Sequence, residues 1–384
     1  MYWVEGLKSK RDFTEYLDGE LIGEDRIIEG ISFDTRTIKP NELFIPLEGA
    51  NFSGKNFVND ALDKDAIILN DENSSNSIVV DDIYTALIKL CQKHIDSLDV
   101  KLILVTGSYG KTTIKEMIKH ASGENCHSSL DNQNNEYGIP YTILSCPKDV
   151  DFLVVECGAR KIGDFDILSK ILISDALILS DIAPVHLETF ENMKNIELTK
   201  LALKRTLKDS GIFIDGRAIE AENYKEKNLK LVSLLLNGLN IPIEKSLESF
   251  QPTNGRGKVI EFMGGKIIDH TYNASPNTLK ETVAEYDSKN TILVLGDMAE
   301  LGPNELNQHI EILDYFNDFN IWVTGPIYRE ARKLSKTKTV NFFEGEDDFP
   351  KEELKLALQT NNNLYFKGSR SSKMERFIKM IIND

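Results

Sequence analysis

The stretch "VTGSYGKTTIKEM", residues 105–117, follows the apolar run "LILV" and decides the fold of the middle of the chain. Residues 107–113 read G-x-x-G-K-T-T, a shorter form of the phosphate-loop pattern G-x-x-x-x-G-K-[ST], because position 105 holds valine. Glycines allow backbone N–H groups to turn toward an anion, and the helix that follows presents the positive end of its dipole. The segment therefore predicts a strand, a turn that binds a nucleoside triphosphate, and a helix.

Two side chains of this loop suit the chemistry of a bound triphosphate. Lys111 is long enough to reach the terminal phosphates, and the hydroxyl group of Thr112 can ligate Mg²⁺. Motors, switches, kinases and ligases all use such a loop, so it predicts ATP or GTP but not the reaction. The residues expected to contact the nucleotide here are Gly107, Ser108, Gly110, Lys111, Thr112 and Thr113.

The composition limits the classes of protein that fit. A chain of 384 residues exceeds one hydrophobic core, and 41% hydrophobic with 28% charged residues is typical of a soluble globular protein. The net charge of −16 argues against a nucleic-acid or membrane-surface binder, although a local basic cluster can still bind an anionic small molecule. The 4 scattered cysteines, with no signal-peptide pattern and no apolar span of about 20 residues, favour a reduced cytoplasmic setting.

We expect three α/β domains, at residues 1–97, 98–251 and 252–384. The first ends in a helical pattern at residues 83–95. In the second, strand-like runs such as "FLVVECG" and "DALILSDI" alternate with helical patterns such as "IELTKLALKRTLK", residues 196–208, which indicates a parallel sheet. The third follows the breaker-rich "QPTNGRG", and "KVIEFMGGKIIDHTYNA" predicts two strands around a Gly-Gly turn, ahead of a doubly wound (Rossmann-like) unit.

Polar residues follow the predicted strands of the middle domain. Glu156 ends "FLVVE", at the sheet edge where doubly wound folds bind ligands, so it is either an Mg²⁺ ligand or a solvated strand end. His186 follows "LILSDIAPV" and is either structural or catalytic. Asn134 and Asn135 in "NQNNEYGIP" suit a turn, and their amides equally suit the orientation of a polar substrate.

Taken in order, these and further motifs resemble the Mur ligase family, ATP-dependent enzymes that join a carboxylate on a UDP-linked sugar peptide to an amine. The resemblance covers nearly the whole chain. The patterns NNxxGxP, GDMxELG and KGSRxxxME favour the branch that adds D-alanyl-D-alanine to a UDP-linked muramoyl tripeptide. The motifs are "ISFDTRTIKPNELFIPLEGANFSGKNFV", "TGSYGKTTIKEM", "NQNNEYGIP", "VVECGAR", "APVHLETFENMKNIELTK", "GRGKVIEF", "DHTYNASP", "VLGDMAELG" and "FKGSRSSKMER".

The resemblance assigns roles to individual residues. It implies that Lys111 contacts the β- and γ-phosphates of ATP, and that Thr112 and Glu156 hold a first Mg²⁺. His186 would belong to a second metal site, and Lys200 would carry a carbamate that ligates Mg²⁺. The expected catalytic residues are thus Lys111, Glu156, His186 and Lys200, and the expected metal ligands are Thr112, Glu156, His186 and Lys200.

Substrate contacts follow from the same resemblance. The first domain would bind UDP through Thr35 and Arg36 of an Asp-Thr-Arg signature, and Asn134 and Asn135 would face the acceptor side of the reaction. The third domain would close over ATP and bind the amine, D-alanyl-D-alanine, while the protein acts as a cytoplasmic monomer in the synthesis of peptidoglycan precursors. The residues of that domain expected to meet ATP are Arg256, Tyr272 and Asn273.

The chain also departs from the family pattern. Lys200 is followed by Leu201 and Ala202 where the family usually has Gly-Glu, and Tyr109 is bulkier than expected in the phosphate loop. The stretch that leads to "QPTNGRG" is short, so we expect the middle sheet to lack several strands. Two alternatives stay open: a related ligase that joins a different carboxylate and amine, and a non-catalytic nucleotide-binding homologue.

Overall fold

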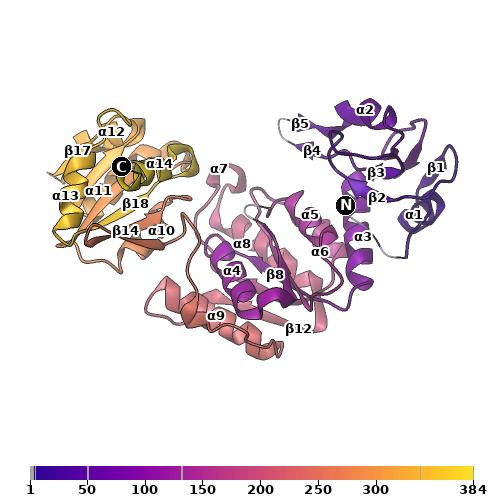
Figure 1. Ribbon diagram of the computed structural model, residues 1–384, viewed down its shortest axis with the longest axis horizontal. Coiled ribbons are helices and arrows are strands. Elements are labelled where there is room, and N and C mark those ends of the chain that lie inside the picture. The colour runs from indigo at the N-terminus through magenta and orange to yellow at the C-terminus, as the bar shows by residue number, and fades with distance from the viewer. Residues whose placement is uncertain (1–3, 5, 50–51, 131–132, 338, 384) are drawn as a thin grey trace.

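The computed structural model describes residue 4 and residues 6–49, 52–130, 133–337 and 339–383. The chain forms three larger sheets in succession, and Figure 1 shows the corresponding parts side by side in an elongated molecule, with the middle part between the other two. The expectation of mixed α/β structure throughout is confirmed. Among the described residues, no helix is long and apolar enough to cross a membrane.

The first part contains a 5-stranded sheet in the order β1-β7-β6-β3-β2, in which only the β1–β7 pair is antiparallel. The two-residue strands β4 (Glu48–Gly49) and β5 (Phe52–Ser53) pair separately. The elements of the sheet and its helices are β1 (Glu20–Ile22), β2 (Gly30–Ser32), β3 (Glu42–Phe44), β6 (Ile67–Asn70), β7 (Ser77–Val79), α1 (Lys10–Leu17), α2 (Val58–Leu62) and α3 (Ile83–Asp96).

The middle part is a fully parallel 5-stranded sheet in the order β12-β11-β8-β10-β9, as the sequence predicts. Alternate residues of β8 face opposite hydrophobic clusters: Leu102 and Leu104 pack on one side, Ile103 and Val105 on the other. The elements are β8 (Lys101–Thr106), β9 (Cys126–Ser128), β10 (Phe152–Glu156), β11 (Ser174–Leu179), β12 (Leu207–Asp215), α4 (Lys111–Ser122), α5 (Gly138–Leu144), α6 (Leu168–Ile171), α7 (Leu187–Phe190), α8 (Met193–Leu201) and α9 (Tyr224–Gly238).

The predicted helix at residues 196–208 is too long. Helix α8 ends at Leu201, a 3₁₀ turn occupies Ala202–Thr206, and Leu207 already opens strand β12. The apolar spacing continues through this segment, but Leu207 pairs with Ser174 of β11, so tertiary pairing overrides the local pattern. After β12, residues 216–257 contain α9 and short turns but no strand, which leaves β12 at the edge of a short sheet.

The last part is a 6-stranded sheet in the order β13-β14-β18-β15-β16-β17, parallel except for the β13–β14 hairpin. The hairpin is confirmed, but its turn residues are Met263 (φ 53°) and Gly264 (φ 94°), and Gly265 already belongs to β14. The elements are β13 (Lys258–Phe262), β14 (Gly265–His270), β15 (Thr291–Gly296), β16 (Asn320–Thr324), β17 (Val340–Phe342), β18 (Asn363–Lys367), α10 (Pro276–Val283), α11 (Glu305–Tyr315), α12 (Pro326–Leu334), α13 (Lys351–Gln359) and α14 (Glu375–Ile382).

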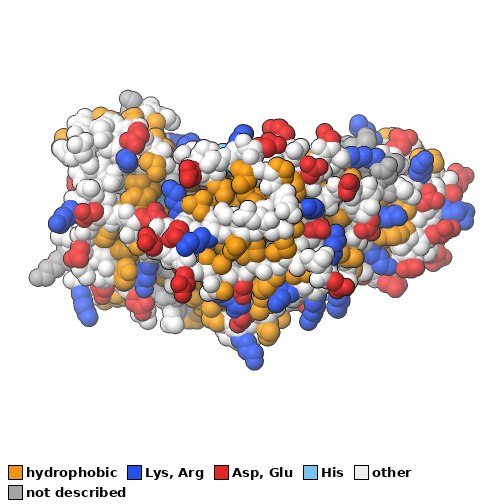
Figure 2. Space-filling view, turned by 90° about the horizontal axis from the view of Figure 1, so that it is seen from below, with side chains coloured by type: hydrophobic (Ala, Val, Ile, Leu, Met, Phe, Trp, Pro, Cys, Tyr) orange, Lys and Arg blue, Asp and Glu red, His pale blue; other side chains and the backbone are white. Residues whose placement is uncertain are grey.

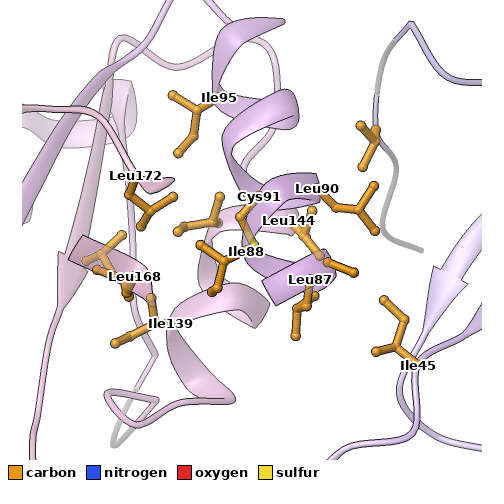
Figure 3. Packing of buried hydrophobic residues seen from close by; sticks show 14 of the residues in the cluster. Ile45, Leu87, Ile88, Leu90, Cys91, Ile95, Ile139, Leu144, Leu168 and Leu172 are labelled. Carbon is orange, nitrogen blue, oxygen red and sulfur yellow. The ribbon is translucent and has the colours of Figure 1, made fainter. Parts of the chain in front are cut away.

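Helix α3, which closes the first predicted domain, packs in both directions. Figure 3 shows Ile88 on the side toward Ile139 of α5 and Leu168 of α6, whereas Leu90 points toward Ile45 of the first part. One continuous hydrophobic cluster therefore joins the first sheet to one face of the middle sheet. The exact boundaries at residues 97 and 251 stay a prediction.

We expect Ile88→Ala to lower the free energy of unfolding by about 2–5 kcal/mol, because Ile88 is fully buried in this shared cluster. Urea unfolding followed by circular dichroism measures the loss. The control is Lys89→Ala on the same helix, which removes only a partly exposed ion pair with Asp18 and should cost less than about 1 kcal/mol. Equal losses in the two variants would contradict the contribution of Ile88 to this shared cluster.

Viewed from below, hydrophobic side chains gather over the middle of the molecule, where α9 and β12 lie in Figure 1 (Figure 2). On α9, Leu234 is 48% exposed. Positively and negatively charged side chains are mixed around this surface and do not form separate basic and acidic patches (Figure 2).

Candidate active site

The phosphate loop lies between β8 and α4, as predicted. Gly107 (φ 143°) and Gly110 (φ 80°) both adopt backbone conformations that residues with a side chain rarely take. A Cβ atom on Gly107 would lie 1.9 Å from Oγ of Ser180, so this position also has no room for one. Gly107 is therefore required by conformation and by space, and Gly110 by conformation.

Two lysines converge on the same carbonyl oxygen of the loop. Nζ of Lys111 donates to the carbonyl of Gly107 at 2.9 Å, and Nζ of Lys200 donates to it at 3.0 Å. Burial lowers the pKa of Lys111, and burial together with Lys111 lowers the pKa of Lys200 well below its usual value. The loop thus holds two amines beside one carbonyl oxygen, where an incoming anion would be stabilised.

Glu156 is buried at the carboxyl end of β10, so the alternative of a solvated strand end is wrong. Its two carboxylate oxygens accept hydrogen bonds from Oγ1 of Thr112 at 2.6 Å and from Nδ2 of Asn134 at 2.8 Å. Asn135 instead accepts the N–H groups of Tyr137 and Gly138 and thereby shapes the turn before α5. The amide of Asn134 therefore contacts the strand-end carboxylate, whereas the amide of Asn135 stabilises the turn before α5. Both residues border the cavity that is described below.

His186 follows β11 in a left-handed conformation (φ 49°) and meets the last part of the chain. Its Nδ1 lies 2.9 Å from Oε2 of Glu300, and this hydrogen bond lowers the pKa of Glu300. His186 is thus one of the residues through which the middle and last parts touch.

A cavity of about 520 Å³ unites these groups between the middle and last parts. On the far wall, the guanidinium of Arg256 stacks over the ring of Tyr272 at 3.6 Å. The residues expected from the sequence that border the cavity are Gly107, Ser108, Gly110, Lys111, Thr112, Thr113, Asn134, Asn135, Glu156, His186, Lys200, Arg256, Tyr272 and Asn273. These predicted residues, which range from Gly107 to Asn273 along the chain, therefore surround one cavity.

Thr35 and Arg36 lie apart from this cavity, in the turn between β2 and β3. Thr35 is buried, and the exposed Arg36 forms an ion pair with Asp34 at 2.7 Å. Their role in UDP binding stays a prediction.

Sequence reasoning assigned no role to several polar residues that lie in or beside the same cavity. Tyr109 contacts both Asp181 and Glu281, and Lys227 forms an ion pair with Asp181. Lys367, the last residue of β18, is buried against the cavity, and burial together with Arg256 lowers its pKa to about 7. Asp181 and Lys367 both follow or end parallel strands, so the rule that sheets bind ligands at their carboxyl edge could have found them.

Two family models match the chain. The Mur ligase family catalytic domain matches residues 27–108, and the Mur ligase middle domain matches residues 105–271. These matches agree with the phosphate loop, the strand-end carboxylate and the cavity described above. The chain belongs to the Mur ligase family.

Individual relatives narrow the comparison. The chain is 28% identical to the UDP-N-acetylmuramoyl-tripeptide–D-alanyl-D-alanine ligase of Bacillus subtilis (strain 168), over 98% of both chains. Its fold is similar to MurF from Acinetobacter baumannii, with a TM-score of 0.83, 21% identity, and coverage of 98% of this chain and 100% of that one. A MurF ligase from Thermotoga maritima in complex with ADP gives a TM-score of 0.78 at 23% identity, covering 92% and 97%.

The alignment with the Bacillus protein spans 454 positions, although this chain has 384 residues, so at least 454 − 384 = 70 of those positions are gaps in this chain. The chain is thus shorter than this relative, which agrees with the short stretch noted before "QPTNGRG". In the structure, β12 is the edge strand of the middle sheet.

Proposed function

We propose that this protein is an ATP-dependent UDP-N-acetylmuramoyl-tripeptide–D-alanyl-D-alanine ligase that acts in peptidoglycan precursor synthesis. The observation that carries the proposal is the cavity that brings Lys111 and Glu156 of the middle part against Arg256 and Tyr272 of the last part. The name of the Bacillus relative, which is similar over almost its full length, supports the choice of substrates. The protein would work as a cytoplasmic monomer and would bind neither nucleic acid nor a membrane.

ATP is the nucleotide that we infer for the phosphate loop, in agreement with the ADP held by the Thermotoga relative. The donor set also fits Mg²⁺, because Thr112 and Glu156 offer hard oxygen ligands within hydrogen-bond distance of each other. The described residues contain no group of three or more His, Cys, Asp or Glu side chains that could hold a metal. Mg²⁺ is commonly bound by one or two protein carboxylates together with the phosphates of its nucleotide, and it would neutralise charge during phosphoryl transfer.

The reaction follows from the chemistry of a carboxylate, which is a poor electrophile. The γ-phosphoryl group of ATP would pass to the tripeptide carboxylate, giving an acyl phosphate and ADP, while Lys111 stabilises the charge on the transferred group. The neutral amine of D-alanyl-D-alanine would then attack the acyl carbon, and phosphate would leave from the tetrahedral intermediate. Residues of both parts surround the cavity, so they would exclude the water that hydrolyses an acyl phosphate.

The first domain would hold the UDP end of the substrate through Thr35 and Arg36. Asn134 would orient the acceptor side through its bond to Glu156. His186 would contribute to a second metal site, in the loop where it now bonds Glu300.

Phosphate release tests the proposal. With ATP, UDP-N-acetylmuramoyl-tripeptide and D-alanyl-D-alanine together, we expect release that depends on all three and that matches the amide product by mass spectrometry. Release stimulated by a different amine, but not by the dipeptide, would favour a related ligase with other substrates. No amide product with any amine, despite nucleotide binding, would favour a non-catalytic homologue.

A further inference from the structure

Tyr109 of the phosphate loop touches the last part of the chain. Its hydroxyl oxygen lies 2.9 Å from Oδ2 of Asp181, which follows β11, and 2.8 Å from Oε1 of Glu281 on α10. A single phenol therefore connects the nucleotide-binding loop with the segment after β11 and with α10 of the last part. Neither the phosphate-loop motif nor the reaction explains why a large aromatic residue stands here.

Counting protons defines the state of this contact. A phenol carries one hydrogen, so it can donate to one carboxylate only, and the second contact needs a proton from the other carboxyl group. Asp181 is the anion, because it forms an ion pair with Lys227 and accepts the N–H group of Ile182 at 2.8 Å. Tyr109 thus donates to Asp181, and a protonated Glu281 donates to the oxygen of Tyr109.

The surroundings of Glu281 agree with this assignment. Burial is the main factor that raises the pKa of Glu281, and the nearby charge of Asp181 adds to it. Lys227 from α9 and Lys367 from β18 lower the pKa of Glu281, as would a hydrogen bond donated by Tyr109, which the proton count assigns to Asp181 instead. No described residue forms an ion pair with Glu281 that would hold it as an anion.

We propose that Tyr109 is a positioning residue that docks the last part of the chain on the phosphate loop, and that Glu281 holds the proton on which this docking depends. The inference rests on one part of the proposed function, namely that the phosphate loop binds a nucleotide. Because the cavity has walls from both parts, docking favours the bound nucleotide. As the pH rises and Glu281 ionises, the oxygen of Tyr109 faces two carboxylates, and the docked form is weakened.

The affinity for ADP, measured by titration calorimetry from pH 5 upward, tests the proposal, because the raised pKa of Glu281 puts its ionisation above the ordinary range of a glutamate. We compare the wild type with Tyr109→Phe, Glu281→Gln and a control, Glu311→Gln, which removes an exposed carboxylate on α11 of the same part of the chain. In Glu281→Gln, the new side-chain amide can donate an N–H group at every pH and so replaces the protonated carboxyl. Other titrating groups, such as Lys367 and the phosphates, remain in all four proteins.

The wild type and Glu281→Gln should bind ADP with the same affinity at low pH. As the pH rises and the wild type loses affinity for ADP, the ratio of the two affinities should change by up to about tenfold per pH unit. The ratio of the affinities of the wild type and Glu311→Gln should stay constant. Tyr109→Phe should bind about five- to tenfold more weakly at low pH, since it loses both hydrogen bonds. A constant ratio for Glu281→Gln, or unchanged affinity in Tyr109→Phe, would overturn the proposal.

Ligase turnover, measured in parallel, separates this inference from the proposed function. A protein that binds ADP with the expected pH dependence but forms no amide product retains the docking contact and rejects the ligase assignment. Amide formation with no difference in ADP affinity between wild type and the two variants rejects the docking contact alone.

Discussion

Lys111→Ala is expected to lower kcat for amide formation by about 10²–10³-fold, the largest effect that we predict for a single substitution. In the free protein, Nζ of Lys111 bonds the loop carbonyls of Gly107 and Ser108, at 2.9 and 3.4 Å. A bound triphosphate offers this partly buried amine a stronger, charged acceptor, and the interaction grows as charge develops on the transferred phosphoryl group. Initial rates of phosphate release with all three substrates present measure the loss.

The matched control is Lys119→Ala, two turns further along α4 and outside the cavity. It removes the same charge from the same helix and should keep at least about half of the wild-type rate. Product formation by Lys111→Ala at the wild-type rate would reject the catalytic assignment of the phosphate loop. Circular dichroism of both variants confirms that each one is folded.

Much of this cavity could be predicted from local patterns in the sequence. The glycines around residue 107 and the carboxylate at the end of "FLVVE" are fixed by strand, turn and helix geometry within a few residues, and the structure places them together. The roles of Lys200, Arg256 and Tyr272 came from the family resemblance, because on a lone helix or turn such residues look like ordinary surface groups. Their burial, or stacking, depends on neighbours that are far away in the sequence.

What the sequence could not provide is contact between distant segments. Tyr109 and Glu281 are 172 positions apart, and no local spacing relates them. The early end of α8 has the same cause, since Leu207 is drawn into a strand by its pairing with β11. In the β13–β14 hairpin, the pairing of Phe262 with Gly265 places the turn one residue earlier than the predicted Gly-Gly pair. Met263 therefore adopts the positive φ that was expected of a glycine.

Lys200 is expected to carry a carbamate, although the Gly-Glu that usually follows it in the family is missing here. Formation of a carbamate joins a neutral amine to CO₂, and the nitrogen loses a proton as the C–N bond forms. Lys200 is 1% exposed, and burial together with Lys111 holds its pKa well below the usual value, so the neutral amine that reacts with CO₂ is available. The residues that follow are part of a helix end and a 3₁₀ turn, and the chemistry of the amine does not need them.

Lys200→Ala should therefore lower the rate of amide formation by about 100-fold, because it removes the carboxylate-like oxygen that the carbamate would supply. Short carboxylic acids such as formate and acetate should restore part of this rate in Lys200→Ala, since they can enter the space that the side chain leaves. The same acids should not raise the rate of the wild type or of Lys204→Ala, which removes an exposed lysine that stacks on Phe213. Carbon-13 resonance of wild type in labelled bicarbonate should show one carbamate that Lys200→Ala lacks. Full activity in Lys200→Ala, or no labelled signal in an active wild type, would reject the carbamate and leave Lys200 as the buried partner of the Gly107 carbonyl.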